Sequence, residues 1–314
     1  MCDMDQNFVL VHPTDRRLLS RGIDCILSQT ERLGRVASTD LVERRRAFDE
    51  YCLAHALDTS RQILAMQDHR IIGASLWVPT PGRTALFYAP QTAPPDAITQ
   101  QAQVQCIRQA AAEARTAGMA LGQVILPPNA QTTAGLYRRA GFSDLATLLY
   151  MRRNRPLFKP TFELLPEFQL ETYSPDRRQD FAQSIEDSYH QTLDCPRLSG
   201  LRPMDDVIAG HQASAFDPSL WLLLKRNGRN AGVLLMAHRL ETATLELVYL
   251  GLHVDCRRMG LGSQLMKLVL LTAMRVQAAT ITLAVDRANT PAVHLYRCLR
   301  FQQTAERLVL IHPL

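Results

Sequence analysis

Residues 254–263 have the sequence VDCRRMGLGS and join an apolar strand pattern to an apolar helix pattern. Glycine at positions 260 and 262 lets a ligand approach the backbone N–H groups, because no Cβ covers them. Those donors and the N-terminus of the following helix favour a phosphate group, and Arg257 and Arg258 add positive charge. The segment indicates a pyrophosphate site, although a glycine-bearing turn that merely starts a helix fits the loop alone equally well.

Two other nucleotide-binding motifs can be compared with the same segment. Gly260-x-Gly262, with Asp286 at the end of the next strand, is weakly similar to a dinucleotide fingerprint. Leu265 takes the place of the third glycine, and too few βα units follow. No Lys-Ser or Lys-Thr pair follows the glycines, which excludes a Walker-type phosphate loop.

The chain contains an internal duplication. Matching residues recur 159 positions apart, as Gly73 and Gly232, Tyr137 and Tyr296, and Phe142 and Phe301. Further upstream, residues 15–17 and 176–178 both have the sequence Asp-Arg-Arg, at an offset of 161 that a small loop insertion would give. These matches, which occur in the same order in both parts of the chain, indicate two similar halves.

Each half has the same coarse order of elements. In the second half, the hydrophobic pattern predicts a hairpin, a third strand, a long helix, a period-two strand and a last helix, at residues 220–237, 245–254, 262–274, 281–285 and 291–299. Hairpin strands followed by alternating helices and strands indicate a mixed α/β sheet. We expect a first domain at 1–151, a basic linker with three prolines at 152–166 and a second domain at 167–314.

A second motif follows the glycine loop. Asn289, Ala292, Tyr296 and Phe301 have the spacing N-x-x-A-x-x-x-Y-x-x-x-x-F, while residues 257–262 fit the form R/Q-x-x-G-x-G/A. With both motifs the second half resembles the GNAT superfamily of N-acetyltransferases, and the first half resembles it more weakly. The resemblance implies two tandem GNAT-like acyl-CoA N-acyltransferase domains, in an arrangement similar to that of mycothiol synthases.

The resemblance also implies a binding site for acetyl-CoA, the acyl-donor substrate. The backbone of a strand carrying Leu252, His253 and Val254 would pair with the pantetheine arm, and Asn289 would contact that arm. The pyrophosphate would be held by Arg257, Arg258, Met259, Gly260, Leu261, Gly262 and Ser263.

Two residues receive catalytic roles from the resemblance. Tyr296 would protonate the departing thiolate, since a tyrosine with a pKa of about 10 keeps its proton at neutral pH. Glu246, on the strand before the loop, falls where some members place a general base, and a carboxylate can take the proton of an amine. The alternatives are a half-buried core tyrosine and a carboxylate held in a surface salt bridge.

The acceptor pocket is expected between the early helices of the second half. That region contains the polar residues Glu186, Asp187, Tyr189, His190, Asp194 and Cys195. Such a cluster is often a solvated loop, but its carboxylates indicate a cationic acceptor if the pocket lies there.

The first half lacks the glycine loop. At the same offset of 159, Phe87 stands at the place of Glu246, and Ile98, Gln101 and Gln103 stand at the places of Arg257, Gly260 and Gly262. We expect a degenerate domain that keeps the fold and does not bind CoA productively.

Composition excludes several other classes of protein. The formal net charge is +5, and the excess comes from Arg152, Arg153, Arg155 and Lys159 in the linker, which argues against nucleic acid as the main partner. The seven cysteines are scattered without C-x-x-C spacing, which argues against a disulfide framework or a metal site. With no signal-peptide pattern and no apolar run of about 20 residues, we expect a cytoplasmic protein that does not associate with membranes.

We therefore expect an N-acetyltransferase that moves an acetyl or other short acyl group from acetyl-CoA to a small-molecule or peptide amine. The alternative is a CoA-binding sensor or scaffold without turnover, against which the presence of Glu246 and Tyr296 argues.

Overall fold

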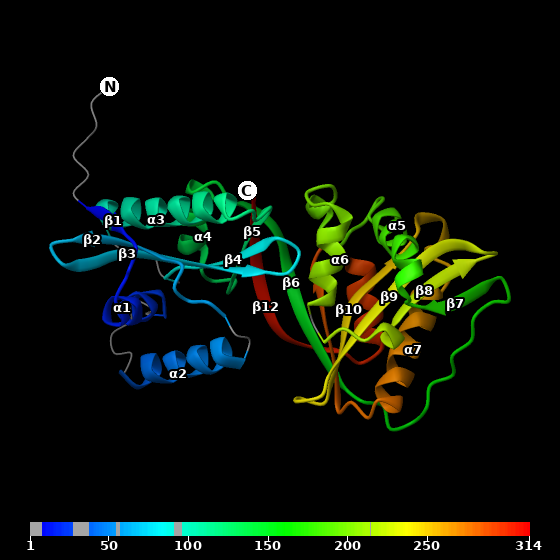
Figure 1. Ribbon diagram of the computed structural model, residues 1–314. Coiled ribbons are helices and arrows are strands. Elements are labelled where there is room, and N and C mark those ends of the chain that lie inside the picture. Colours follow the sequence, from blue (N-terminus) through cyan, green and yellow to red (C-terminus); the bar gives the residue numbers. More distant parts are fainter. Residues whose placement is uncertain (1–7, 28–37, 55–56, 91–95, 214) are drawn as a thin grey trace. The chain divides into compact units, whose positions relative to one another are not determined.

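The computed structural model describes residues 8–27, 38–54, 57–90, 96–213 and 215–314. The chain divides into two compact units: residues 1–145 with 308–314 form the first, and residues 146–307 form the second. Each unit contains a mixed β-sheet with helices on both faces (Figure 1). This architecture confirms the α/β class that the sequence predicts.

The sheet of the first unit has the strand order β1-β2-β3-β4-β5-β12. Its strands are β1 (Val9–Val11), β2 (Gln62–Gln67), β3 (Arg70–Thr80), β4 (Thr84–Tyr88), β5 (Leu121–Leu126) and the end of β12 (Gln302–Pro313). Its helices are α1 (Arg16–Leu27), α2 (Ser38–Ala54), α3 (Ala97–Thr116) and α4 (Gln131–Arg139). Because α1 and α3 cover opposite faces, the neighbouring residues Ile63 and Leu64 of β2 are both fully buried, one in each core.

The sheet of the second unit has the strand order β12-β6-β11-β10-β9-β8-β7, to which β12 contributes its residues up to Arg307. Its strands are β6 (Ser143–Asn154), β7 (Phe168–Thr172), β8 (Trp221–Arg226), β9 (Arg229–Arg239), β10 (Thr244–Leu252) and β11 (Thr280–Asp286). Its helices are α5 (Arg178–Ser188), α6 (Met204–Gln212), α7 (Leu261–Arg275) and α8 (Thr290–Cys298). Short 3₁₀ turns lie at Pro175–Arg177, Pro196–Leu198, Pro218–Leu220 and Val254–Cys256.

Two separate cores hold these helices to the second sheet. The α7 side buries Leu261, Leu265 and Val269 at helical spacing against residues such as Leu245 and Leu283. The α5 side buries Phe181 and Ile185 of α5 with Ile208 of α6 and with residues of β8 and β9. The helix predicted over 262–274 and the strand predicted over 281–285 are both confirmed, because their patterns are local and unambiguous.

The two units differ from the domain boundaries drawn from the sequence. Arg152 lies opposite Thr282 in the ladder between β6 and β11, so the expected linker begins inside a strand. At the other end of the chain, residues 308–313 of β12 pair with β5 and belong to the first unit. Strand pairing joins residues far apart in sequence, which hydrophobic periodicity cannot detect.

The end of β10 also differs from its expected position. The strand ends at Leu252, and Val254 begins a 3₁₀ turn, so His253 and Val254 lie beyond the strand to which the sequence assigned them. The N–H of His253 still donates to the carbonyl of Ala231 in β9.

Leu310 of β12 gives a test of this division. The side chain is fully buried in the core of the first unit, so Leu310→Ala should lower the free energy of unfolding of that unit by about 2–5 kcal/mol. The two tryptophans, Trp77 and Trp221, lie one in each unit and report their unfolding separately by fluorescence. In Leu310→Ala, the Trp77 transition should move to a lower denaturant concentration, while the Trp221 transition should change little. In the control Gln303→Ala, which alters an exposed side chain, neither transition should move. A shift confined to Trp221 would contradict the assignment.

Candidate functional site

The centre of the second unit is a divergence between β10 and β11. The two strands pair in parallel only from Thr244 opposite Thr280 to Leu247 opposite Leu283. Beyond this point β10 continues against β9, whereas β11 continues against β6. Among the described residues, the β11-facing edge of β10 therefore has no strand partner after Leu247. Apart from the carbonyl of Leu252, which Arg257 binds, the backbone N–H and C=O groups on this edge are available to an extended ligand.

A β-bulge lies at the start of this divergence. Leu247 is opposite Met236 and Tyr249 is opposite Leu235, which leaves Val248 as an extra residue in β10. Val248 and Tyr249 consequently both pack on the α5 side of the sheet instead of alternating between its faces.

The glycine loop has the geometry expected of an anion site. Gly260 has φ +79°, and no atom of the described structure lies within 4 Å of the place where a Cβ would be. The next residue begins α7, so the N–H groups of Leu261, Gly262 and Ser263 have no acceptor within the helix. Arg258 is exposed with φ +62°. These features fit a diphosphate at the positive end of the α7 dipole.

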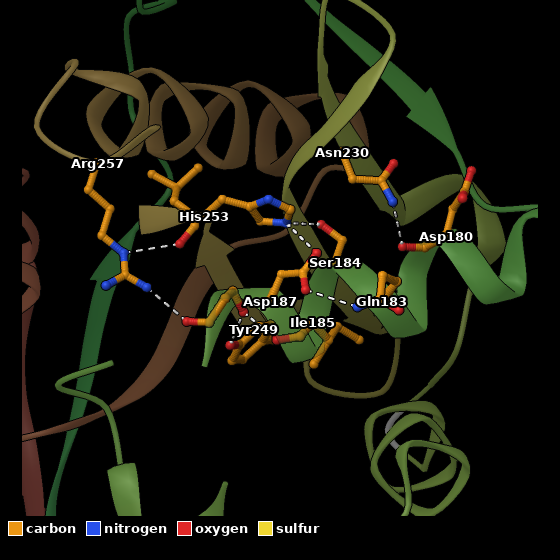
Figure 2. A network of polar contacts seen from close by, with 11 residues as sticks. Asp180, Gln183, Ser184, Ile185, Asp187, Asn230, Tyr249, His253 and Arg257 are labelled. Atoms are coloured by element: carbon orange, nitrogen blue, oxygen red, sulfur yellow. Dashed lines mark hydrogen bonds and ion pairs between the residues drawn. The ribbon is translucent and has the colours of Figure 1, made fainter. Parts of the chain in front are cut away.

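Arg257 has a different role from the one that its charge indicates. Its guanidinium donates to the backbone carbonyls of Leu252, Ser188, His190 and Gln191, at 2.8–3.0 Å. Figure 2 shows this side chain extending toward α5. Arg257 therefore ties the end of β10 to the end of α5, where carbonyls lack helical partners, and four of its five N–H donors are used by these carbonyls.

His253 also contacts α5 (Figure 2). Its Nε2 lies 3.1 Å from the hydroxyl of Ser184 and 3.7 Å from a carboxylate oxygen of Asp187. A Ser-His-Asp relay needs its serine and its acid on different ring nitrogens. Because both contacts use one nitrogen and Ser184 is fully buried, this group is not a nucleophilic triad.

Tyr296 lies on α8 with 7% of its surface exposed. Burial is the main cause that raises its pKa above the ordinary value, and the negative charge of Asp194 adds to this effect. The phenol therefore keeps its proton at neutral pH. In the first unit, Tyr137 is fully buried, and its hydroxyl has no hydrogen-bond partner among the described residues. Of the two tyrosines at equivalent positions, Tyr296 is therefore the one with the larger exposed fraction.

Asn289 is the N-cap residue of α8. Its side-chain oxygen accepts a hydrogen bond from the N–H of Ala292 at 3.4 Å, and its side chain also bonds Asp194. The residue that was expected to contact the cofactor arm therefore starts a helix and holds a carboxylate.

Glu246 lies two residues before the bulge, on the α5 side of the sheet. One carboxylate oxygen accepts hydrogen bonds from Arg239 at 2.8 and 3.0 Å, which corresponds to the salt-bridge alternative for this residue. Tyr150 of β6 lies on the same face, opposite the exposed Ala284. Burial raises the pKa of Tyr150, and the charges of Arg307 and Glu246 act on it more weakly. No sequence motif indicated Tyr150, because β6 lies in the chain before the half that contains both motifs.

The loop between α5 and α6 is fixed to the end of β11. The N–H of Asp286 donates to Asp194 Oδ1 at 2.9 Å, and the N–H of Cys195 donates to Asp286 Oδ2 at 3.2 Å. The other residues proposed for the acceptor pocket are not all gathered there: Glu186 and His190 are exposed, and Asp187 bonds Gln183 on its own helix.

The first unit lacks the bare helix end, although its strands β4 and β5 also diverge, since they pair only as far as Leu86 opposite Gln123. Gln103, which replaces Gly262, is buried, and its side-chain amide bonds both the N–H and the C=O of Ala74 in β3. Helix α3 begins at Ala97, five residues before the position equivalent to the start of α7. The carboxylate of Asp96 caps it by accepting from the N–H of Thr99.

The residues that the structure describes contain no group of three or more His, Cys, Asp or Glu side chains that could hold a metal ion. None of the described helices is both long enough and apolar enough to cross a bilayer.

Residues 178–301 match the model of the Acetyltransferase (GNAT) family. This part of the chain belongs to the GNAT acetyltransferase family. Its match contains the divergent strands, the glycine loop, Asn289 and Tyr296. No curated protein is significantly similar in sequence to this chain.

Solved structures extend the likeness to both halves. A GCN5-related N-acetyltransferase of Sphaerobacter thermophilus is 14% identical, with 99% of this chain and 97% of that chain covered and a TM-score of 0.58. A conserved protein of unknown function from Staphylococcus epidermidis is 12% identical, with 76% and 90% covered and a TM-score of 0.50. A tandem GNAT protein from the clavulanic acid biosynthesis pathway is 14% identical, with 98% of each chain covered and a TM-score of 0.48. At 14% identity, the likeness to the Sphaerobacter structure over nearly the whole of both chains shows the fold alone, which is that of two tandem GNAT-like domains.

His211 of α6 makes the stability of the GNAT domain depend on pH. Its ring lies 5.3 Å from that of Tyr249, and its Nε2 is buried without a hydrogen-bond partner among the described residues. Burial, and next the charge of Arg202, lower its pKa from 6.5 to about 4. The unfolded chain therefore binds this proton more strongly than the folded one.

Stability due to neutral His211 is present above pH 6.5 and is lost as the pH falls toward 4. We expect the Trp221 unfolding transition to lose about 2–3 kcal/mol across this window. His211→Phe, which keeps the ring contact with Tyr249, should flatten that dependence in urea titrations between pH 4 and 7. An unchanged slope in the variant would show that other groups cause it.

Proposed function

We propose that the GNAT domain transfers an acetyl or other short acyl group from acyl-CoA directly to an amine, which is a small molecule or part of a peptide. The observation that carries this proposal is the unpaired edge of β10 beyond Leu247, which leads to the bare N-terminus of α7. An extended pantetheine arm suits the strand edge, and a diphosphate suits the helix end. Membership of residues 178–301 in the GNAT family supports the same assignment.

In this proposal the backbone between Leu252 and Val254 guides the arm of acetyl-CoA. The diphosphate is bound by N–H groups of residues 258–263, with Arg258 adding charge. Arg257 holds the loop in place through the carbonyls that it binds. The chemistry that acetyl-CoA supplies is an activated thioester.

The chain's own groups then serve the transfer. A free N–H of β10 near the bulge stabilises the oxyanion that forms when the amine attacks. Tyr296, protonated because burial raises its pKa, donates its proton to the departing thiolate. The base is a carboxylate on the α5 side of the sheet, for which the sequence points to Glu246. Holding amine and thioester in line supplies much of the remaining rate.

The second candidate function is a CoA-binding sensor without turnover. It is favoured by the ion pair of Glu246 with Arg239, because this carboxylate already has a partner within the protein.

Gly260→Ala tests the diphosphate site. The added Cβ meets no described protein atom but occupies the space above the free N–H groups, so the affinity for CoA should fall by roughly tenfold or more. Gly228→Ala is the matched control, since Gly228 has φ +80° and equally open surroundings in the turn between β8 and β9. Both variants carry a left-handed alanine, which costs about 1–2 kcal/mol of stability. Calorimetric titration should show weaker CoA binding only for Gly260→Ala, and equal losses in both would refute the site.

Turnover is tested with acetyl-CoA, a panel of primary amines and a thiol-reactive dye. Wild-type protein should release free CoA with at least one amine. Tyr296→Phe should lower kcat by about 10²–10⁴-fold and keep the affinity for CoA, because it removes only the proton donor. Tight CoA binding with no thiol release across the panel would favour the sensor and exclude the transferase.

A further inference from the structure

Asp194 is held at the C-terminal end of β11 by a reciprocal pair of hydrogen bonds. Asp286 N–H donates to Asp194, and Cys195 N–H donates back to Asp286. The second oxygen of Asp286 accepts from the N–H of Ala288 at 2.9 Å, so backbone donors occupy both of its oxygens. Asp286 is therefore an anchor, and the carboxylate that it positions is that of Asp194.

The surroundings of Asp194 come from three elements of the candidate site. The pKa of Tyr189, Tyr249 and Tyr296 is raised first by burial, and the charge of Asp194 raises each of them further. Asp194 thus lies within Coulombic range of the residue after the β10 bulge and of the phenol on α8. Arg202 acts on Tyr189 in the opposite direction.

The pKa of Asp194 lies above its ordinary value. Burial raises its pKa, and the neighbouring charge of Asp286 adds to this, while the hydrogen bonds from Asp286 N–H and Asn289 act in the opposite direction. In Glu246, by contrast, one carboxylate oxygen accepts hydrogen bonds from two N–H groups of Arg239. A carboxylate with a raised pKa takes a proton from an ammonium group more readily than one paired with arginine.

We propose that Asp194, rather than Glu246, is the base that deprotonates the acceptor amine. This inference rests on the proposed transferase function. The negative charge of Asp194 attracts the protonated amine.

The protons balance as follows in this assignment. Asp194 takes one proton from the ammonium, and the neutral nitrogen bonds to the thioester carbon. Tyr296 gives its proton to sulfur as the C–S bond breaks. The second nitrogen proton returns through solvent to the Tyr296 phenoxide, and Asp194 releases its proton to solvent. One proton is released for each amide and each free thiol formed.

The test compares Asp194→Asn with Glu246→Gln over a range of pH. Asparagine keeps an oxygen for Asp286 N–H, so the loop stays in place and the affinity for CoA is unchanged. We expect kcat/KM of Asp194→Asn to fall by about 10²–10⁴-fold at neutral pH. The deficit should shrink as the pH approaches the pKa of the amine, because a neutral amine needs no base. Asp205→Asn, an exposed carboxylate change on α6, serves as the control with normal activity.

Three results would overturn the assignment. One is Asp194→Asn with normal activity beside an active wild-type protein. Another is a loss of kcat/KM in Asp194→Asn that does not depend on pH, or that comes with a loss of CoA affinity. Such a result is expected if Asp194 only holds the loop in place. The third is a pH-dependent deficit in Glu246→Gln instead. A wild-type protein that releases no CoA with any amine would refute the transferase function itself and is thus a separate outcome.

Discussion

The second unit depends on one constraint: β10 and β11 cannot remain paired beyond Leu247. The extra residue at the bulge turns β10 away, while β11 keeps its ladder with β6 as far as Asp286. The unpaired edge, the loop around Gly260 and the first turn of α7 follow one another along the chain. A strand edge and a helix end, both with unsatisfied N–H groups, are thereby supplied by one continuous segment.

In the first unit, two polar side chains lie in the region that corresponds to the glycine loop of the second unit. The amide of Gln103 satisfies β3 at Ala74, and α3 starts earlier with Asp96 as its cap. The carboxylate of Asp96 caps α3, whereas the N-terminus of α7 in the second unit has no side-chain cap. The fold is retained because its apolar cores are retained, with Tyr137 and Phe142 packed edge to face in one of them. Binding capacity and fold are thus separate properties of this sequence pattern.

Several polar residues near the site hold protein rather than ligand. Arg257 satisfies four carbonyls, Asn289 caps α8, and Asp286 anchors the loop that carries Asp194. Buried polar groups must be hydrogen-bonded, so a motif residue that finds a protein partner becomes part of the framework. The groups left for a ligand are mainly backbone N–H groups, which any sequence provides and which only glycine and chain geometry expose.

The sequence by itself determined the features that depend on neighbours along the chain. These are the extents of α7 and β11, the open conformation at Gly260 and the tyrosine position on α8, because helical periodicity, strand alternation and glycine act locally. Only the tertiary structure decided the partners of Arg257 and Glu246, the place of Tyr150, and the assignment of residues 308–313 to the first unit. Asp194 and Asp286 are 92 positions apart, and a hydrogen bond over that separation exists only once strands and loops from distant segments have packed together.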